Sequence, residues 1–374
     1  MNLSIRVIDT DTGFRSIQKE WDALYENCDK AGIFSSWDWM HTWWEVFSKN
    51  LKTELFIICL YDEDSLVGIA PFHIVSSFPK SWIQGKTLCF IGSGEEKKDM
   101  IVTQFNDFIV AAGYEDQMVD QISDYLENTT SNWSFADFEF LLKDSLIAKC
   151  FSSVNSKIIK GEVDYGVRFI VSGMADFEQY QSKMGKRWRK MYAKKSRILS
   201  RDGEVTTKIT DDLQSIDESF ELLSKMHSSR WNDRAKLNIF DSPLFKEFHL
   251  EALKRLVPKQ KAFIKTLYLD EKPLATYYCF VDKGVIHYYQ SGFYSENANR
   301  YSPLFILVCN EIGEAIKNKQ VFDFMFSDAG DSYKKEQYAA ETEPMFRLRW
   351  SPHKYRFTLF NIAKFIQLKI LKVD

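Results

Sequence analysis

The sequence has few cysteines and no long apolar run, and both shortages exclude classes of protein. The six cysteines among 374 residues lie far apart, without a C-x-x-C pair. This spacing argues against a disulfide framework and is typical of core cysteines in a reducing compartment. No apolar run approaches the roughly 20 residues that cross a bilayer, and the first residues do not resemble a signal region. We therefore expect a cytoplasmic protein.

The sequence also lacks a net positive charge and clustered histidines. The formal net charge is −3 at pH 7, so the chain as a whole does not attract nucleic acid, and we expect no DNA partner. The six histidines show no H-x-x-x-H or H-E-x-x-H spacing, so we expect no metal. With 45% hydrophobic and 27% charged residues, the chain is long enough to bury two cores.

An internal duplication is the most informative feature of the sequence. The stretch 54–75 reads as a β-hairpin and resembles 261–281, about 207 residues later. Upstream, Ile33–Ser36 and the helix after it resemble Ile239–Ser242 and its following helix at nearly the same offset. Stacked repeat proteins use shorter periods and more copies, so two copies predict two lobes. We expect the two hairpins at equivalent places in lobes of like topology.

The order of elements predicts a mixed α/β (α+β) sheet with helices on its faces. The predicted helices lie at 14–28, 37–49, 114–128, 144–153, 211–229, 243–256 and 302–318. Besides the hairpins, strands are predicted at 87–91, 105–110, 133–141, 285–293 and 321–327.

The helix at 37–49 is rich in tryptophan, with aromatic residues on two of its faces. Trp39, Trp43 and Phe47 share one face, whereas Trp37 and Trp44 lie on another. A surface helix buries one face. We therefore expect at least one of these faces to line a cleft or the contact between lobes, with Trp37 binding substrate; the alternative is a helix simply packed on a sheet.

Several motifs resemble those of double-GNAT proteins, the group of FemAB/FemX-type peptidoglycan aminoacyltransferases and CelD-like acetyltransferases. In the second half these motifs are His287–Tyr294, Tyr301-Ser302-Pro303 opening a helix, Phe322-Asp323-Phe324 and Ser332-Tyr333-Lys334. The first half contributes Trp21, Leu24, Phe34, Trp37-x-Trp39 and Val67–Phe72. The resemblance covers roughly residues 15–345 and is greater for the CelD-like branch.

The resemblance implies two tandem GNAT-like lobes with a cleft between them. The implied segments are an N-terminal lobe (1–172), a basic helical connector (173–205), a C-terminal lobe (206–350) and a basic, apolar tail (351–374). It also implies an enzyme that transfers an acyl group from acyl-CoA, such as acetyl-CoA, to an amine or hydroxyl. The acceptor would be a sugar, nucleotide-sugar or polysaccharide and cell-envelope precursor, with polysaccharide-synthesis machinery as a partner. The alternatives are an aminoacyl-tRNA-dependent Fem-type transferase and a non-catalytic GNAT-fold binding protein.

The same resemblance assigns roles to individual residues. Lys334 would orient or stabilise the acyl carbonyl or leaving group, with Tyr333 as proton donor and Asp328 as base. Backbone N–H groups of the strand 285–293 would stabilise the oxyanion, as in GNAT enzymes, and Tyr289 on that strand would contact the substrate. Asp107 resembles the acidic strand position of the first lobe and is expected to face the substrate.

One motif of GNAT enzymes is missing. Their acyl-CoA phosphates are held by backbone N–H groups of a glycine-rich turn at a helix N-terminus. Here the corresponding stretch, Ser295–Pro303, has no glycine. Ser302 is suited to cap the next helix and Pro303 to its first turn, so the helix itself is expected.

A basic amphipathic helix spans Lys183–Arg201, with nine Lys or Arg in nineteen residues and no acidic residue. Like charges at three- and four-residue steps repel, which suggests a polyanionic partner. We expect Arg187, Arg189, Lys190 and Arg197 to bind a phosphate group; a solvated connector is the alternative. The tail 351–374 combines basic residues with Phe357, Phe360 and Phe365. It is expected either to touch an anionic membrane peripherally or to pack as a last helix.

Overall fold

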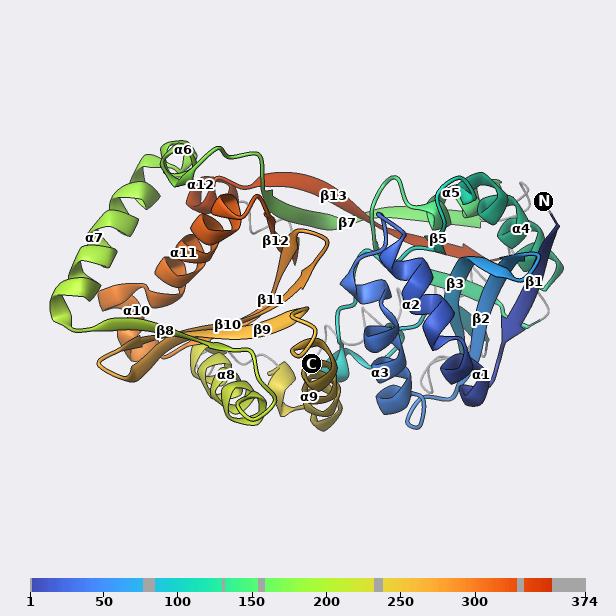
Figure 1. Cartoon of the computed structure of the whole chain (residues 1–374), viewed down its shortest axis with the longest axis horizontal. Helices are drawn as coiled ribbons and strands as arrows, with labels where there is room; N and C mark the ends of the chain where they lie inside the picture. Colours follow the sequence, from blue (N-terminus) through green and yellow to red (C-terminus); the bar gives the residue numbers. More distant parts are fainter. Residues whose placement is uncertain are drawn as a thin grey trace, which may run out of the picture. The chain divides into compact units, whose positions relative to one another are not determined.

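The computed structural model describes residues 2–76, 85–129, 132–153, 159–231, 238–327 and 333–351. The chain divides into two compact units (Figure 1). Unit 1 comprises Met1–Glu95, Ile101–Tyr165 and Met345–Asp374, and unit 2 comprises Glu96–Met100 and Gly166–Pro344. This division differs from the expected boundaries, because the basic connector belongs to unit 2 and residues 345–350 belong to unit 1. Of the tail, only Ser351 lies within the described residues.

Unit 1 has a sheet in the order β1-β2-β3-β4-β6-β13, in which only the β4 and β6 neighbours run parallel. Its strands are β1 (Leu3–Ile8), β2 (Thr53–Asp62), β3 (Ser65–Ser76), β4 (Lys86–Phe90), β6 (Phe135–Leu141) and β13 (Glu341–Ser351), with β5 (Ile109–Val110) beside β3. Its helices are α1 (Asp11–Ser16), α2 (Gln18–Glu26), α3 (Trp37–Phe47), α4 (Glu115–Asn128) and α5 (Leu146–Ser153).

Unit 2 repeats this order as β8-β9-β10-β11-β12-β7, again with one parallel pair, β11 and β12. Its strands are β7 (Ile159–Val171), β8 (Val205–Thr210), β9 (Ala262–Leu269), β10 (Lys272–Asp282), β11 (Val285–Phe293) and β12 (Val321–Ser327). Its helices are α6 (Phe177–Lys183), α7 (Lys186–Asp202), α8 (Ile216–Trp231), α9 (Pro243–Leu256), α10 (Ser295–Tyr301), α11 (Pro303–Lys317) and α12 (Tyr333–Tyr338).

The matching strand orders give the two units the like topology that the predicted duplication requires. The hairpins β2–β3 and β9–β10 occupy the same second and third places in their units. The short 3-10 turns Ile33–Ser35 and Ile239–Asp241 precede helices capped by Ser36 and Ser242, whose hydroxyls each accept a backbone N–H. The sixth strand of each unit comes from a different part of the sequence than the strands before it. β7 follows the helices of unit 1 in the chain but pairs in unit 2, whereas β13 is the last described strand and pairs in unit 1.

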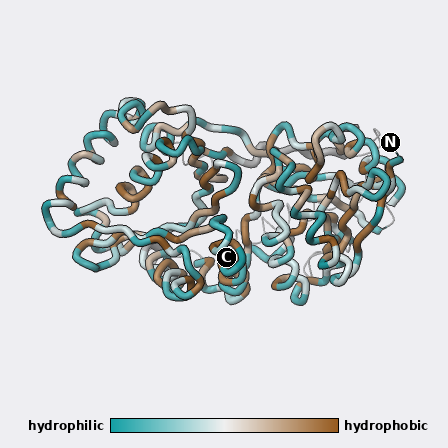
Figure 2. The backbone as a smooth tube through the Cα atoms, in the orientation of Figure 1, coloured by the Kyte–Doolittle hydropathy of each residue, from teal (hydrophilic) through white to brown (hydrophobic). Residues whose placement is uncertain are grey.

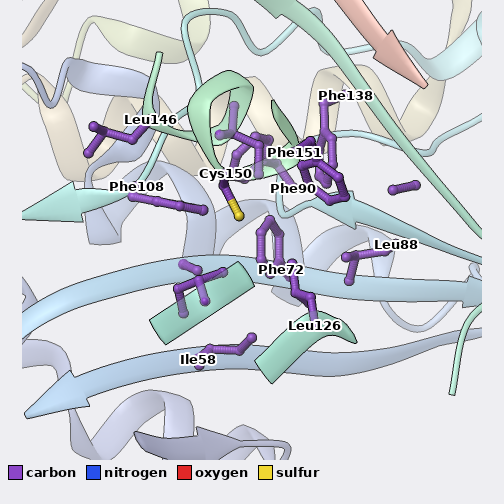
Figure 3. Packing of buried hydrophobic residues seen from close by; sticks show 14 of the residues in the cluster. Ile58, Phe72, Leu88, Phe90, Phe108, Leu126, Phe138, Leu146, Cys150 and Phe151 are labelled. Carbon is purple, nitrogen blue, oxygen red and sulfur yellow. The ribbon is translucent and has the colours of Figure 1, made fainter. Parts of the chain in front are cut away.

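The core of unit 1 lies between its sheet and the helices α4 and α5. Phe72, Phe90 and Phe138 form an aromatic group whose ring centroids are 4.9 to 5.6 Å apart, and Phe151 of α5 packs on Phe138 (Figure 3). Hydrophobic residues gather along strands of both units, whereas most residues of α7 are hydrophilic (Figure 2). Among the described residues, no helix is long and apolar enough to cross a membrane.

Helix α3 is buried on both aromatic faces, so the inference that at least one of them is available to a cleft is wrong. Trp39 and Trp43 are fully buried, and Trp37 is only 7% exposed. The Trp37 ring stacks on His41 at a centroid distance of 4.0 Å and meets the edge of Phe14 of α1. Helix α3 is thus an inner element, packed on α2 as well as against β3, and both faces are core. Substrate binding by Trp37 stays a prediction that this packing does not support.

In unit 1, a loop lies against the ends of the two parallel strands. Gly92, just after β4, has a left-handed backbone (φ +99°), and a Cβ there would lie 2.7 Å from the Thr103 hydroxyl. The N–H of Phe105, two residues after Thr103, donates to the Phe140 carbonyl of β6 at 3.1 Å. The segment 103–105 therefore contacts both β4 and β6 where they have stopped pairing with each other.

Glu95 lies in the loop between Gly92 and the segment 103–105. The pKa of its carboxyl group provides a test of how this loop packs. The Glu95 carboxylate accepts the Ile101 N–H at 2.7 Å and the Trp43 indole N–H at 3.3 Å, yet burial raises its pKa to about 7. Because the folded pKa is above the unfolded one, the folded state holds its proton more firmly, and stability falls as pH rises from about 4.5 to about 7.

Glu95→Gln should therefore become progressively more stable than the wild type through that pH range. Urea unfolding at about pH 5 and about pH 8 measures the effect, since only the wild type gains a buried charge between them. A stability difference between variant and wild type that is the same at both pH values would show that Glu95 is not buried as a carboxylic acid.

Candidate functional site

The two parallel strands of unit 2 separate after three paired residues. β11 and β12 pair from Val285 with Val321 to His287 with Asp323. Beyond these residues β11 stays paired with β10 as far as Phe293, and β12 with β7 as far as Ser327. Among the described residues, no backbone segment pairs with the facing edges of β11 after His287 and β12 after Asp323. We call these two stretches the open edges.

Lys334 lies at the end of the open edges, and its predicted catalytic role stays a prediction. It is half-buried on α12, and its ammonium donates to the Ser327 hydroxyl at the end of β12. Its Nζ lies 5.4 Å from the ring centroid of Phe169 and 5.7 Å from that of Phe324. A cation among aromatic rings, at the end of an unpaired strand edge, can stabilise negative charge that develops nearby.

The other two predicted catalytic residues are less well placed or not described. Tyr333 precedes Lys334 on α12 and its side chain is 46% exposed. Its role as proton donor stays a prediction. Asp328, the predicted base, lies outside the described residues.

On the opposite face of the same strands, Asp323 holds a buried charged group together. Its Oδ2 lies 3.2 Å from Arg168 Nη1 of β7 and 3.4 Å from His287 Nδ1 of β11, and its Oδ1 accepts the Met325 N–H at 2.7 Å. Arg168 also contacts Glu343, at 2.6 Å from Nε to Oε2. Three strands are thereby joined at the point where β11 and β12 separate.

Tyr289 follows on β11, and its hydroxyl lies 3.1 Å from Nε2 of His249 on α9. His249 is fully buried, and burial lowers its pKa well below the ordinary value, so the imidazole is neutral near pH 7. A neutral imidazole can accept the Tyr289 hydroxyl proton in one tautomer. The pair therefore fixes the Tyr289 hydroxyl beside the open edges, in keeping with its predicted contact with substrate, which stays a prediction.

The sequence alone missed Arg168, the partner of Asp323, and His249, the partner of Tyr289. Nothing in the sequence marked Arg168 or His249, because each comes from an element distant in the chain. A usable signal was the recurrence of Asp-Phe at Asp137-Phe138 and Asp323-Phe324. Asp137 on β6 contacts Arg347 and Arg349 of β13, as Asp323 contacts Arg168 of β7.

Asp137, and not Asp107, is therefore the acidic strand residue of unit 1, so the expected equivalence of Asp107 is wrong. Asp107 precedes β5 and accepts the N–H groups of Leu146 and Ile147 at 2.6 and 2.9 Å. It satisfies the first turn of α5, where a helix has unpaired donors. Burial raises the pKa of Asp107 to about 6.

The stretch that replaces the glycine-rich turn forms an additional short helix, α10, before α11. Pro303 occupies the first turn of α11 as predicted, but Ser302 is not its side-chain cap. Ser302 adopts a left-handed backbone (φ +50°), and its hydroxyl lies 3.4 Å from the Ala298 carbonyl behind it. The Ser302 N–H donates to the same carbonyl, and Pro303 has no N–H. Few backbone donors therefore remain here to hold a pyrophosphate.

The basic helix α7 packs one face on unit 2 and exposes the other. Its apolar side chains, among them Trp188 and Ile198, pack against the unit 2 core, and Tyr192 donates to Asn310. The cations that the sequence assigned to phosphate binding are all exposed: Arg187, Arg189, Lys190 and Arg197. Of these, Arg189 donates to the Ser182 carbonyl. No ion pair to a carboxylate is present for these four within the described part of the chain. Their phosphate binding stays a prediction.

Metal ligands are not grouped in the described ranges, where no set of three His, Cys, Asp or Glu side chains could hold a metal ion.

Comparison with known proteins is consistent with this geometry. Residues 186–335 match the family model described as acetyltransferase (GNAT) domain. A search of curated protein sequences finds no match. The crystal structure of FemX is similar with a TM-score of 0.61 and 10% identity, covering 89% of this chain and 95% of FemX. The structure of L-PGS from Bacillus licheniformis is similar with a TM-score of 0.54 and 14% identity, covering 92% and 96%.

A third similar structure is the C-terminal domain of a putative lysylphosphatidylglycerol synthetase from Agrobacterium fabrum. Its TM-score is 0.53 at 12% identity, with 94% of this chain and 96% of that chain covered. At these identities the similarity shows the fold alone. The chain therefore has a Fem-like fold of two tandem GNAT-like lobes, with an acetyltransferase (GNAT) domain at residues 186–335.

Proposed function

We propose that the protein is an acyltransferase whose reaction takes place at the open edges of unit 2. The observation that carries this proposal is the separation of β11 and β12 directly beside Lys334 and the Asp323 group. Unpaired backbone N–H groups of β11 would hold the acyl carbonyl, and the Lys334 ammonium would stabilise the charge that forms on it or on the leaving group. Unit 1 has the loop 103–105 at the equivalent place, which favours unit 2 as the donor lobe.

The donor and acceptor follow from the resemblance of the motifs. GNAT domains generally use acyl-CoA, and we propose acetyl-CoA or another acyl-CoA as donor. The acceptor would be an amine or hydroxyl of a sugar, nucleotide-sugar or polysaccharide and cell-envelope precursor, supplied by polysaccharide-synthesis machinery in the cytoplasm. The unpaired strand edges are suited to the acyl and pantetheine part of such a donor, whereas its pyrophosphate has few backbone donors at Ser302 and Pro303.

That mismatch favours a second candidate, transfer from an aminoacyl-tRNA. Such a donor presents the carbonyl of an oxygen ester, in place of the thioester of acyl-CoA, to the open edges but carries its phosphates along an extended strand. The exposed cations of α7 repeat along a helix of 17 residues, about 25 Å long, and α7 packs against α10, which replaces the glycine-rich turn. A row of cations of this length is better matched to a polyanion than to one pyrophosphate.

One experiment separates these candidates. The purified protein is incubated with acetyl-CoA and a panel of amino sugars and nucleotide sugars, and free thiol is measured as CoA is released. In parallel, it is incubated with alanyl-tRNA and the same acceptors, and loss of the ester is measured. Acceptor-dependent thiol release supports the acyl-CoA reaction, and acceptor-dependent ester loss supports the second candidate. Neither product, with folded protein, would reject catalysis in favour of a binding protein.

Neutralising the exposed face of α7 gives a further prediction. Arg187→Ala, Arg189→Ala and Lys190→Ala together should lower the affinity for total tRNA and reduce its salt dependence, with a slope smaller by about 2 to 3. The unfolding midpoint should change little, because exposed charges contribute little to stability. Binding is measured by fluorescence anisotropy at several salt concentrations.

A charge-matched control comes from exposed lysines of unit 1. Lys19→Ala, Lys49→Ala and Lys52→Ala remove the same charge elsewhere, and the salt slope should then stay near that of the wild type. Equal losses in the two triple variants would mean that only net charge matters. A large loss of stability in the α7 variant, with unchanged affinity, would make the helix purely structural.

A further inference from the structure

Unit 2 has a cavity that takes no part in the site described above. It has a volume of about 1090 Å³ and lies between the start of α6, one face of α11 and the sheet at β8 and β9. This volume is at the upper end of the range of about 300–1,000 Å³ found for small-molecule sites. None of the residues of the open edges lines it.

The charged groups at the floor of this cavity are already paired. Ile209, Lys265 and Tyr277 lie side by side across β8, β9 and β10. Above this row, Glu311 of α11 forms an ion pair with Lys265 and accepts the Tyr277 hydroxyl at 2.5 Å. Lys265 and Glu311 are only 14% and 7% exposed, so the pair is fixed in the wall. The floor therefore has no unpaired charge that a ligand must neutralise.

Apolar side chains form much of the rest of the wall, together with the polar Thr207 and Asn310. Met174 and Phe177 line it from the start of α6, Leu307 and Ile316 from α11, and Ile209 from β8. Ile209 is 49% exposed although it faces the cavity, and covering such a side chain is favourable. An occupant with a hydrocarbon part would gain this contact.

Charged side chains of both signs lie at the rim, among them Asp176 before α6, whose carboxylate accepts the Gln179 N–H at 2.7 Å. Lys317 is 76% exposed and lies 3.9 Å from Glu314, and exposed Lys319 follows at the end of α11. Glu314 offsets the Lys317 charge, whereas Lys319 has no carboxylate within ion-pair distance in the described part of the chain. An anionic head at the rim would therefore find one ammonium partner, while the chain behind it meets mainly apolar walls and satisfied polar groups.

We propose that this cavity binds a single-chain anionic amphiphile of the fatty-acid type. Its hydrocarbon chain would lie along Phe177, Leu307 and Ile209, with its carboxylate in water beside Lys319. This ligand is distinct from the substrates of the open edges, so the proposal does not depend on acyl transfer. The site would let the protein respond to, or carry, such amphiphiles.

The probe is sodium dodecanoate, titrated into the full-length protein by isothermal calorimetry below its micelle concentration. We expect saturable binding of dodecanoate and none of butanoate, which lacks the chain. Thr207→Trp adds a large ring on the strand face that lines the cavity and should weaken binding by about tenfold or more, the equivalent of roughly 1.5 kcal/mol of lost apolar contact. Thr207 is exposed, so this variant is expected to fold.

Thr206→Trp is the matched control, because Thr206 is exposed on the same strand but its side chain points to the other face of the sheet. It should bind dodecanoate like the wild type. If Thr207→Trp were unfolded, Ile209→Asp would test the same wall, since a carboxylate there opposes a hydrocarbon chain. The proposal is overturned if the wild type shows no saturable binding, if butanoate binds equally, or if the cavity variants bind no more weakly than Thr206→Trp.

Discussion

Replacing Lys334 with methionine should lower the turnover of acyl transfer by roughly 10²-fold or more, the scale seen when one stabilising donor is removed from a developing negative charge. Methionine keeps the length and apolar stem of the side chain and removes only its ammonium. The measurement is the steady-state rate, by thiol release or ester loss, with the donor that the assays above identify.

The structural reason lies in the fixed position of the ammonium. Its bond to the Ser327 hydroxyl anchors it at the last residue of β12, and the rings of Phe169 and Phe324 limit its movement. A charge held in place before the reaction needs no reorganisation when the transition state forms. We therefore expect the loss mainly in kcat and less in KM, because the interaction strengthens as charge develops.

Lys335 supplies the matched control, since it is the next residue of α12 and is exposed. Lys335→Met removes the same charge from the same helix and should leave turnover close to that of the wild type. If Lys334→Met transferred acyl groups as fast as Lys335→Met, with an unchanged melting temperature, Lys334 would have no part in the mechanism. The binding-protein alternative would then gain support.

Much of the fold was predictable because its signals are local. The hairpins β2–β3 and β9–β10 are runs rich in apolar residues around short acidic or charged turns, and helices α4 and α11 show helical periodicity. The strands β1, β7, β8 and β13 were not predicted. β8 is almost wholly exposed and β13 alternates charged with apolar residues, so neither has a strong hydrophobic signal. Their pairing depends on partners far away in sequence.

Residues of the site could be predicted from the sequence only where they belong to a recognisable motif. Lys334 belongs to the Ser332-Tyr333-Lys334 motif that resembles the double-GNAT pattern, and the structure places its ammonium at the last residue of β12. Arg168 could not be predicted, because it reaches Asp323 from a strand that precedes it by about 155 residues. The aromatic helix α3 misled the interpretation for a related reason. Whether a second aromatic face is covered depends on which neighbours pack on it, and the sequence of the helix does not contain that information.

Asp323→Ala should cause the largest loss of stability, about 3 kcal/mol of unfolding free energy, because removing one partner of a buried ion pair leaves charge uncompensated. Asp323 is fully buried and holds Arg168, His287 and the Met325 N–H together. Glu343 would still neutralise part of the Arg168 charge, which places the loss at the lower end of the expected range. Urea unfolding at neutral pH measures it.

Two variants sharpen this test. Asp323→Asn keeps an oxygen that can accept the Met325 N–H and should lose less than the alanine variant, since only the charge is removed. Asp137→Ala changes the equivalent residue of unit 1, where Asp137, Arg347 and Arg349 are each 16 to 21% exposed. Water screens that group, so the loss should be smaller, about 1–2 kcal/mol. If Asp137→Ala lowered the free energy of unfolding as much as Asp323→Ala, the deeper burial of the Asp323 group would not make it the more stabilising of the two. The Asp323 group could then not be the rigid support from which β11 and β12 separate.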